Sequence, residues 1–280
     1  MKVTLWGTRG SLASPGPETA RYGGNTSCVS VEDGNGSLLV LDAGSGIRRL
    51  GMGAASKYKR IDILLTHLHL DHILGLGFFS PLFNPAFETH IWGPASVRET
   101  LISRLMRYLS PPLFPLHLTE LSFSLHLHDV PCAACEIGEF QIESSLICHP
   151  GATVGYRITH TNGKVLAYMP DHEPALGAVE YPLPPEWTSG YDIAQDADLL
   201  IHDAQYTPHE YEDKVGWGHS TIQQGLTFGE LCEVKEFVTF HYDPDHDDAT
   251  LDRNIGQAVE EIKPHFKVTP GLEGMRFDLK

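Results

Sequence analysis

The stretch 66–72, with the sequence Thr-His-Leu-His-Leu-Asp-His, constrains this chain more than any other feature. It follows the apolar run 61–65, which is typical of a buried strand, and precedes residues 73–76, which can begin a helix. Four strong metal-ligating side chains therefore gather at a strand end: His67, His69, Asp71 and His72. A histidine-rich surface loop is the alternative, and we would prefer it for a single histidine but not for four ligands so close together.

The spacing of these four side chains predicts two neighbouring cation sites. In an extended segment alternate side chains point the same way, so His67 and His69 can reach one cation. Asp71 and His72 come where the chain turns into the helix, and they can face a second cation. Neutral imidazole combined with carboxylate suits zinc, manganese or iron better than magnesium. We expect two divalent metal ions per chain, with zinc as the default.

Several further strand-like runs end in a polar, ionisable residue. Asp42 follows the run 38–41, His149 follows 139–147, and Asp171 follows 164–168. His149 can supply the third protein ligand that a metal holding two imidazoles needs, and Asp171 can bridge two cations. Asp203 and His241 end two later runs. Each of these residues alone has a structural explanation, as a buried hydrogen-bonded histidine or a turn aspartate, but their joint occurrence favours one site.

Composition limits the class of protein. The 280 residues are 41% hydrophobic, enough for a sizeable core, and we expect a single domain over residues 1–280. No run approaches the roughly 18 to 20 apolar residues of a membrane span. The first residues lead directly into strand-like sequence without the apolar region of a signal peptide. A cytoplasmic location and no membrane partner are therefore expected.

Charge limits the partners. Twenty basic residues against 36 acidic ones give a formal net charge of −16, which repels a polyanion. We expect a small anionic substrate and no long nucleic acid; the oligomeric state stays open, with a homodimer as one alternative. Five cysteines, an odd number, indicate thiols in a reducing compartment. Cys132 and Cys135 form a C-x-x-C without a second such pair, so a structural or incidental role is expected rather than a zinc knuckle or redox pair.

Other residues have two interpretations at this stage. Arg9, in a long loop rich in glycine, either contacts an anionic substrate or pairs with Glu18 or Glu32. Asp42 can orient a metal-bound histidine or cap the following helix, and the two roles are not exclusive.

The segment after the central motif offers candidates for the pocket. Residues 78–87 are apolar and aromatic, and they form either a lid or a packed loop, with Phe78 and Phe83 as candidate contacts for a base. A helix is expected over residues 95–109, with a solvated face that carries Arg98, Arg104 and Arg107.

His126 and His128 lie two apart on a predicted strand, 122–128. They could start a second metal site, but neither a carboxylate nor a third ligand follows at useful spacing. We therefore interpret this pair as surface.

The pattern H-x-H-x-D-H resembles the signature of the metallo-β-lactamase superfamily, and the resemblance spans essentially the whole chain. It implies a layered α/β fold, a four-layer αββα sandwich with two mixed sheets face to face and helices outside. It also implies a dinuclear centre with seven ligands: His67, His69, Asp71, His72, His149, Asp171 and His241.

The motifs 200–205 and 218–221 are similar to paired motifs of ribonuclease Z and related phosphodiesterases. The resemblance implies that His219 is the general acid and Asp203 its partner, although glutamate is usual at the position of Asp203. Asp71 would act as ligand and proton acceptor. Residues 150–170 are too few for the arm that grips transfer RNA, so small phosphodiesters such as cyclic nucleotides are favoured. The alternatives are a thioester or lactone hydrolase, an RNA or DNA nuclease, and a non-catalytic metal-binding module.

Overall fold

Strand β3 (Leu38–Leu41) shows how the sequence builds layers. All four of its side chains are buried. Leu39 and Leu41 pack into the core between two sheets, whereas Leu38 and Val40 pack into a core beneath helices. A strand that is apolar on both faces is typical of a sheet covered on both sides. The computed structural model describes residues 1–53, 57–120, 124–130, 135–178 and 180–280.

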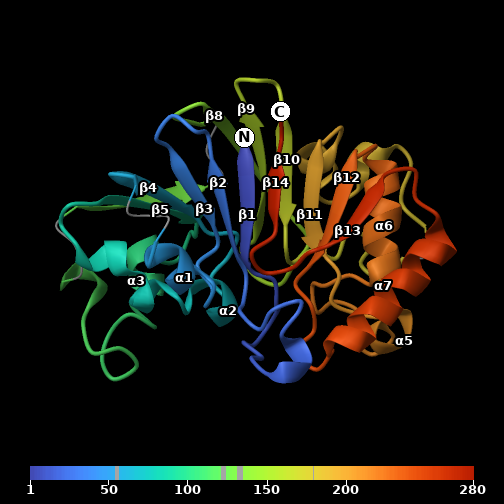
Figure 1. Ribbon diagram of the computed structural model, residues 1–280, viewed down its shortest axis with the longest axis horizontal. Helices are drawn as coiled ribbons and strands as arrows, with labels where there is room; N and C mark the ends of the chain where they lie inside the picture. Colours follow the sequence, from blue (N-terminus) through green and yellow to red (C-terminus); the bar gives the residue numbers. More distant parts are fainter. Residues whose placement is uncertain (54–56, 121–123, 131–134, 179) are drawn as a thin grey trace.

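Two seven-stranded mixed sheets lie face to face, and helices cover both outer faces (Figure 1). The first sheet has the strand order β14-β1-β2-β3-β4-β5-β6, with neighbours from β3 to β6 parallel. Its other strands are β1 (Lys2–Gly7), β2 (Cys28–Glu32), β4 (Arg60–Leu64), β5 (Glu88–Pro94), β6 (Leu125–Val130) and β14 (Arg276–Asp278). The predicted four-layer αββα sandwich is confirmed. That residues 1–280 form one domain stays a prediction.

The second sheet has the order β13-β12-β11-β10-β9-β8-β7, with neighbours from β10 to β13 parallel. Its strands are β7 (Cys135–Ile137), β8 (Phe140–Leu146), β9 (Val154–His160), β10 (Val165–Met169), β11 (Leu199–Asp203), β12 (Glu236–Phe240) and β13 (Lys267–Pro270). Strands β9 and β10 form an antiparallel hairpin, and Gly163 in its turn has a φ of 83°. Such a left-handed conformation favours glycine.

Helices α1 and α3 lie on one side of the sandwich, and α6 and α7 lie on the other (Figure 1). The α-helices are α1 (Ile47–Gly51), α2 (Leu70–Ile73), α3 (Leu101–Leu105), α4 (Tyr191–Ala194), α5 (Pro208–Tyr211), α6 (Ile222–Leu231) and α7 (Asp248–Ile262). Short 3₁₀ turns are η1 (Pro17–Thr19), η3 (Leu76–Phe78), η4 (Ser80–Phe83), η5 (Leu118–Glu120) and η6 (Pro185–Trp187). Within the described residues, no helix has the length and apolarity needed to cross a membrane.

Two predicted elements differ from the structure. The helix expected over residues 95–109 is reduced to α3, because the Thr100 side chain caps its start by accepting a hydrogen bond from the Ser103 amide. The strand expected over 122–128 is β6, which extends to Val130; residues 122 and 123 lie outside the described residues. Cys132 also lies outside them, so its pairing with Cys135 is not described.

Candidate metal centre

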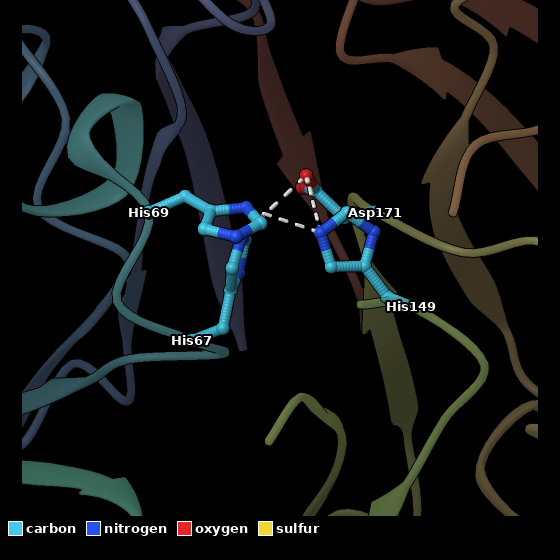
Figure 2. Close-up of side chains that lie close together, drawn as sticks. All are labelled: His67, His69, His149 and Asp171. Carbon is cyan, nitrogen blue, oxygen red and sulfur yellow. Dashed lines mark hydrogen bonds and ion pairs between the residues drawn. The ribbon is translucent and has the colours of Figure 1, made fainter. Parts of the chain in front are cut away.

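Three histidines and one aspartate from three separate segments form a first cluster of metal ligands (Figure 2). His67 and His69 follow β4, His149 comes three residues after β8, and Asp171 comes two residues after β10. One ligand atom from each lies within 4.8 Å of the others. His149 Nε2 is 3.2 Å from His69 Nδ1, and His67 Nε2 is 3.7 Å from Asp171 Oδ2. Nitrogens and oxygens this close surround a space that one cation would fill.

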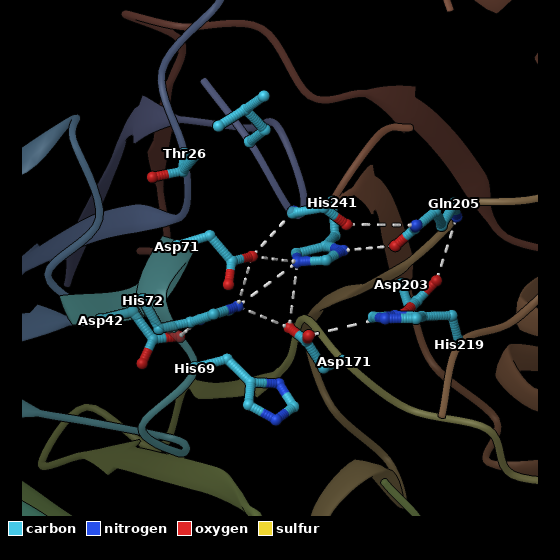
Figure 3. Close-up of polar contacts among 12 residues, drawn as sticks. Thr26, Asp42, His69, Asp71, His72, Asp171, Asp203, Gln205, His219 and His241 are labelled. Atoms are coloured by element: carbon cyan, nitrogen blue, oxygen red, sulfur yellow. Dashed lines mark hydrogen bonds and ion pairs between the residues drawn. The ribbon is translucent and has the colours of Figure 1, made fainter. Parts of the chain in front are cut away.

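A second cluster lies against the first and shares Asp171 with it (Figure 3). Helix α2 supplies Asp71 and His72, and the end of β12 supplies His241. Asp171 Oδ1 is 3.0 Å from His72 Nε2 and 3.3 Å from His241 Nε2. Asp71 Oδ2 is 3.2 Å from each of the same two nitrogens. The structure thus brings all seven sequence-predicted ligands together, with Asp171 between the two clusters.

The chemistry of these donors fits divalent transition metals. Burial lowers the pKa of His67, His69 and His149, so each imidazole is neutral and offers a lone pair. Nε2 of His67 is buried and has no hydrogen-bond partner among the described residues. A buried nitrogen without a partner is costly unless something else binds it. The first cluster therefore fits a metal ion held by three imidazoles and a carboxylate.

The second cluster concentrates negative charge in the interior. Burial by itself would lower the pKa of His72, but the carboxylates of Asp171, Asp71 and Asp42 raise it well above its usual value. Burial also opposes ionisation of Asp71, yet His72 and His241 hold the pKa of this carboxyl far below its usual range. Buried carboxylates that stay ionised require nearby positive charge. A divalent cation would supply it.

Neighbouring groups hold the ligand histidines by their other ring nitrogen. Nδ1 of His72 lies 2.8 Å from Asp42 Oδ2, Nδ1 of His149 lies 2.8 Å from the Gly218 carbonyl oxygen, and Nδ1 of His241 lies 2.9 Å from Gln205 Oε1. Acceptors at Nδ1 leave Nε2 to bind a metal. Asp42 thus lies where it can orient His72. The capping interpretation is wrong, because Gly46 is the N-cap of α1.

His219 and Asp203 form a hydrogen-bonded pair at the side of the second cluster (Figure 3). His219 Nδ1 is 2.7 Å from Asp203 Oδ2, and the other Asp203 oxygen accepts from the backbone amides of Gln205 and Ser220. Burial opposes protonation of His219, but Asp203 raises the pKa of the imidazole above its usual value. His219 Nδ1 is also 3.9 Å from Asp171 Oδ2. The pair places an imidazole, with Nε2 uncommitted to Asp203, next to the shared ligand Asp171.

A cleft of about 370 Å³ opens beside His67 and His69. Its wall is largely apolar and includes Ile73, Tyr108 and Leu113, and two arginines line it as well, Arg104 and Arg107. Cavities of this size and character are typical of small-molecule sites.

Comparison with known proteins identifies the family. Residues 39–242 match the beta-lactamase superfamily domain. The chain belongs to this superfamily. The ribonuclease Z of Haloarcula marismortui is 27% identical over 283 residues, covering 86% of each chain. The structure resembles human tRNase Z, short form, with a TM-score of 0.67, 21% identity and coverage of 100% of both chains. It resembles unliganded yeast PDE1 with a TM-score of 0.69, 16% identity and coverage of 99% of each.

These relationships establish the chain as a metal-dependent hydrolase of the beta-lactamase superfamily. The His/Asp clusters agree with that class, because they supply the donors for divalent metal ions.

Arg9 does not contact the metal centre of this hydrolase. Its side chain is fully buried and donates to the backbone oxygens of Gly23, Asp243 and His246. The expected pairing with Glu18 or Glu32 is not found, and the guanidinium is directed at backbone oxygens instead. The loop reaches the site through Ser11 instead, whose backbone amide donates to Asp71 Oδ2 at 2.8 Å.

The sequence interpretation of the cleft also needs correction. Arg104 and Arg107 line the cleft rather than a purely solvated face. Phe78 and Phe83 are exposed by 60% and 41% and are not among the residues that line it. Gln205 was missed, although its position two residues after the end of β11 is a signal, since strand ends carry most of the site.

Proposed function

We propose that this hydrolase cleaves small phosphodiesters and that its two ligand clusters hold two divalent metal ions, zinc by default. The observation that carries the proposal is the His219–Asp203 pair beside Asp171. A phosphodiesterase needs a proton donor for its leaving oxygen in addition to its metals, and this pair fits that role. Thioester hydrolysis expels a thiolate, which needs such a donor less.

The chain's own residues have distinct parts in the proposed reaction. Bound divalent ions would supply the Lewis acidity that lowers the pKa of water and neutralises the phosphoryl oxygens. Asp71 would accept a proton from the attacking water. His219 would donate a proton from Nε2 to the leaving oxygen, while Asp203 holds Nδ1 and keeps the ring oriented.

The cleft supports a small substrate with one charged and one apolar part. Arg104 and Arg107 bring positive charge to an otherwise acidic chain, and charged guanidinium groups pair well with phosphate. The apolar wall around Ile73, Tyr108 and Leu113 suits a base or an aryl group. A cyclic nucleotide meets both requirements, and PDE1, a neighbour in fold, is a phosphodiesterase.

A nuclease is the second candidate function, because relatives of this chain are named ribonuclease Z. Against a long substrate stand the net charge of −16 and the interval 150–170, which the hairpin β9–β10 largely occupies. That no long nucleic acid and no membrane is a partner stays a prediction, as does the homodimer. We propose the reducing cytoplasm as the compartment; among the described residues, Cys28, Cys148 and Cys232 form no disulfide.

A substrate panel at fixed Mn²⁺ or Zn²⁺ tests the function. It contains bis-p-nitrophenyl phosphate, 3′,5′-cyclic mononucleotides, linear dinucleotides, lactoylglutathione and precursor tRNA. We expect turnover of the aryl diester and of a cyclic nucleotide, with precursor tRNA uncut. Turnover of the thioester without any phosphodiester cleavage would overturn the proposal.

A pair of arginine variants tests the placement of the substrate. Arg107→Gln should raise KM for the phosphodiester because it removes a charge from the cleft. Arg98→Gln, on the same segment but outside the residues that line the cleft, serves as the control and should leave KM unchanged.

A further inference from the structure

Three side chains on β5 and β6, outside the catalytic centre, have the arrangement of a metal site. Glu88 and His90 are two apart on β5 and share one face, and His126 is the partner of His90 in the parallel pairing with β6. One ligand atom from each lies within 4.8 Å of the others. Glu88 Oε1 is 2.9 Å from His90 Nε2 and 3.8 Å from His126 Nε2.

A fourth residue orients His90. Nδ1 of His90 is 2.8 Å from Nε2 of His128, whose ring stacks on Trp92 with centroids 3.9 Å apart. At the distance of 2.8 Å, His128 Nε2 can accept the Nδ1 proton of His90. Trp92 is itself fixed, because its indole N–H donates to Asp62. His90 Nε2 is therefore the nitrogen left for a metal, as in sites where a neighbour sets the tautomer of a ligand histidine.

Access from solvent differs among the three candidate ligands. The side chains of His126 and Glu88 are each about half exposed, at 50% and 49%, whereas that of His90 is 10% exposed. An ion can therefore enter from solvent and still meet a preorganised donor. The sequence alone did not predict this site, because the missing carboxylate and third ligand come from the neighbouring strand and do not follow His128 in the chain.

We propose that Glu88, His90 and His126 bind a third divalent transition-metal ion of the zinc class. Two imidazoles and one carboxylate are a known zinc set that leaves a coordination position open. The ion would join β6, an edge strand of the first sheet, to β5. This proposal stands independently of the proposed phosphodiesterase activity.

The test is the number of zinc ions bound by the full chain in equilibrium dialysis, with the catalytic centre loaded beforehand. We expect three ions in the unaltered chain and two in both His126→Ala and Glu88→Gln. His128→Ala should lower the affinity for the third ion by roughly 10- to 100-fold, as loss of an orienting partner does in other metal sites.

His265→Ala is the matched control. His265 is 91% exposed in its side chain and lies 3.4 Å from Glu230, a histidine–carboxylate pair that belongs to none of the ligand clusters found among the described residues. This variant should keep three ions. Two ions in the unaltered chain, or three retained in both His126→Ala and Glu88→Gln, would overturn the proposal. Retention of catalytic-site metal and activity in the two variants shows that they remain folded.

Discussion

At the scale of single residues, three histidines of the metal centre use one ring nitrogen for a supporting hydrogen bond and direct the other at the clusters. His72, His149 and His241 each give Nδ1 to a neighbouring oxygen and direct Nε2 at the clusters. Fixing one nitrogen sets the tautomer, and so decides which nitrogen carries a lone pair. His219 also has a carboxylate at Nδ1, as His72 does, but it approaches Asp171 through that same Nδ1, at 3.9 Å, rather than through Nε2, which suits a proton donor rather than a ligand.

Replacement of His219 by alanine should separate catalysis from metal binding. His219→Ala should keep both catalytic metal ions and lose roughly 10²- to 10⁴-fold in kcat, the usual contribution of a general acid. His209→Ala, at an exposed histidine nearby in the chain, is the control and should keep full activity. Elemental analysis and steady-state kinetics measure the two effects. Loss of metal from His219→Ala would show that His219 is a ligand.

Asp71→Ala should behave differently, because the Asp71 carboxylate lies 3.2 Å from Nε2 of both His72 and His241. We expect loss of the ion in the second cluster together with loss of activity. Elemental analysis of the reconstituted variant checks the outcome. Asp213→Ala, at an exposed position, should retain all metal. Full metal content in Asp71→Ala would contradict its assignment as a ligand.

At the scale of elements, loops after strands carry the centre, and other loops support them. Glu173 shows this support: its buried carboxylate accepts from the amides of Gly216 and Gly218 and from the Tyr211 hydroxyl. The loop that contains Gly216 and Gly218 also supplies the Gly218 carbonyl oxygen, which accepts a hydrogen bond from His149. The position of His149 therefore depends on the backbone of a segment far along the chain.

Gly218 gives the sharpest test of this dependence. A Cβ there would lie 2.3 Å from His149 Nδ1, and its φ of +91° is a conformation that other residues rarely adopt. Gly218→Ala should displace His149 and weaken metal binding in the first cluster. Gly216→Ala is the matched control, because Gly216 has a φ of +87° but an added Cβ there would meet no atom of the described residues within 4 Å. In both variants, backbone strain should lower the free energy of unfolding by roughly 1–3 kcal/mol. Equal metal affinity in the two would contradict the account.

The strand ends were predictable because an apolar run and the polar residue after it are local features of the chain. Neighbouring parallel strands end at the same edge of a sheet, so Asp171, Asp203 and His241 meet once those strands pair. Burial of Arg9 was not predictable, because its carbonyl partners lie far along the sequence. The partnership of His90 with His126 likewise depends on strand register, which a local pattern does not contain.

At the scale of the whole molecule, Arg9 links the N-terminal loop to the loop after β12. Its guanidinium donates to backbone oxygens of Gly23, Asp243 and His246, beside the segment that carries His241. A buried guanidinium that donates to several backbone carbonyls stabilises the fold rather than binding the substrate.

Arg9→Met should therefore lower the free energy of unfolding by about 2–4 kcal/mol, because it leaves buried carbonyls without donors. KM for the phosphodiester should not change. Arg21→Met is the control: Arg21 is half exposed and ion-paired with Asp252, so the loss of folding stability there should be much smaller. Urea unfolding and steady-state kinetics provide the measurements. A raised KM with unchanged stability would restore Arg9 as a substrate contact.

The central claim is that two clusters sharing Asp171 hold two metal ions. The most direct measurement is elemental analysis of the His126→Ala chain after reconstitution with Zn²⁺ or Mn²⁺, since this variant removes the proposed surface ion from the count. We predict two ions per chain. One ion per chain, or none, would contradict the claim.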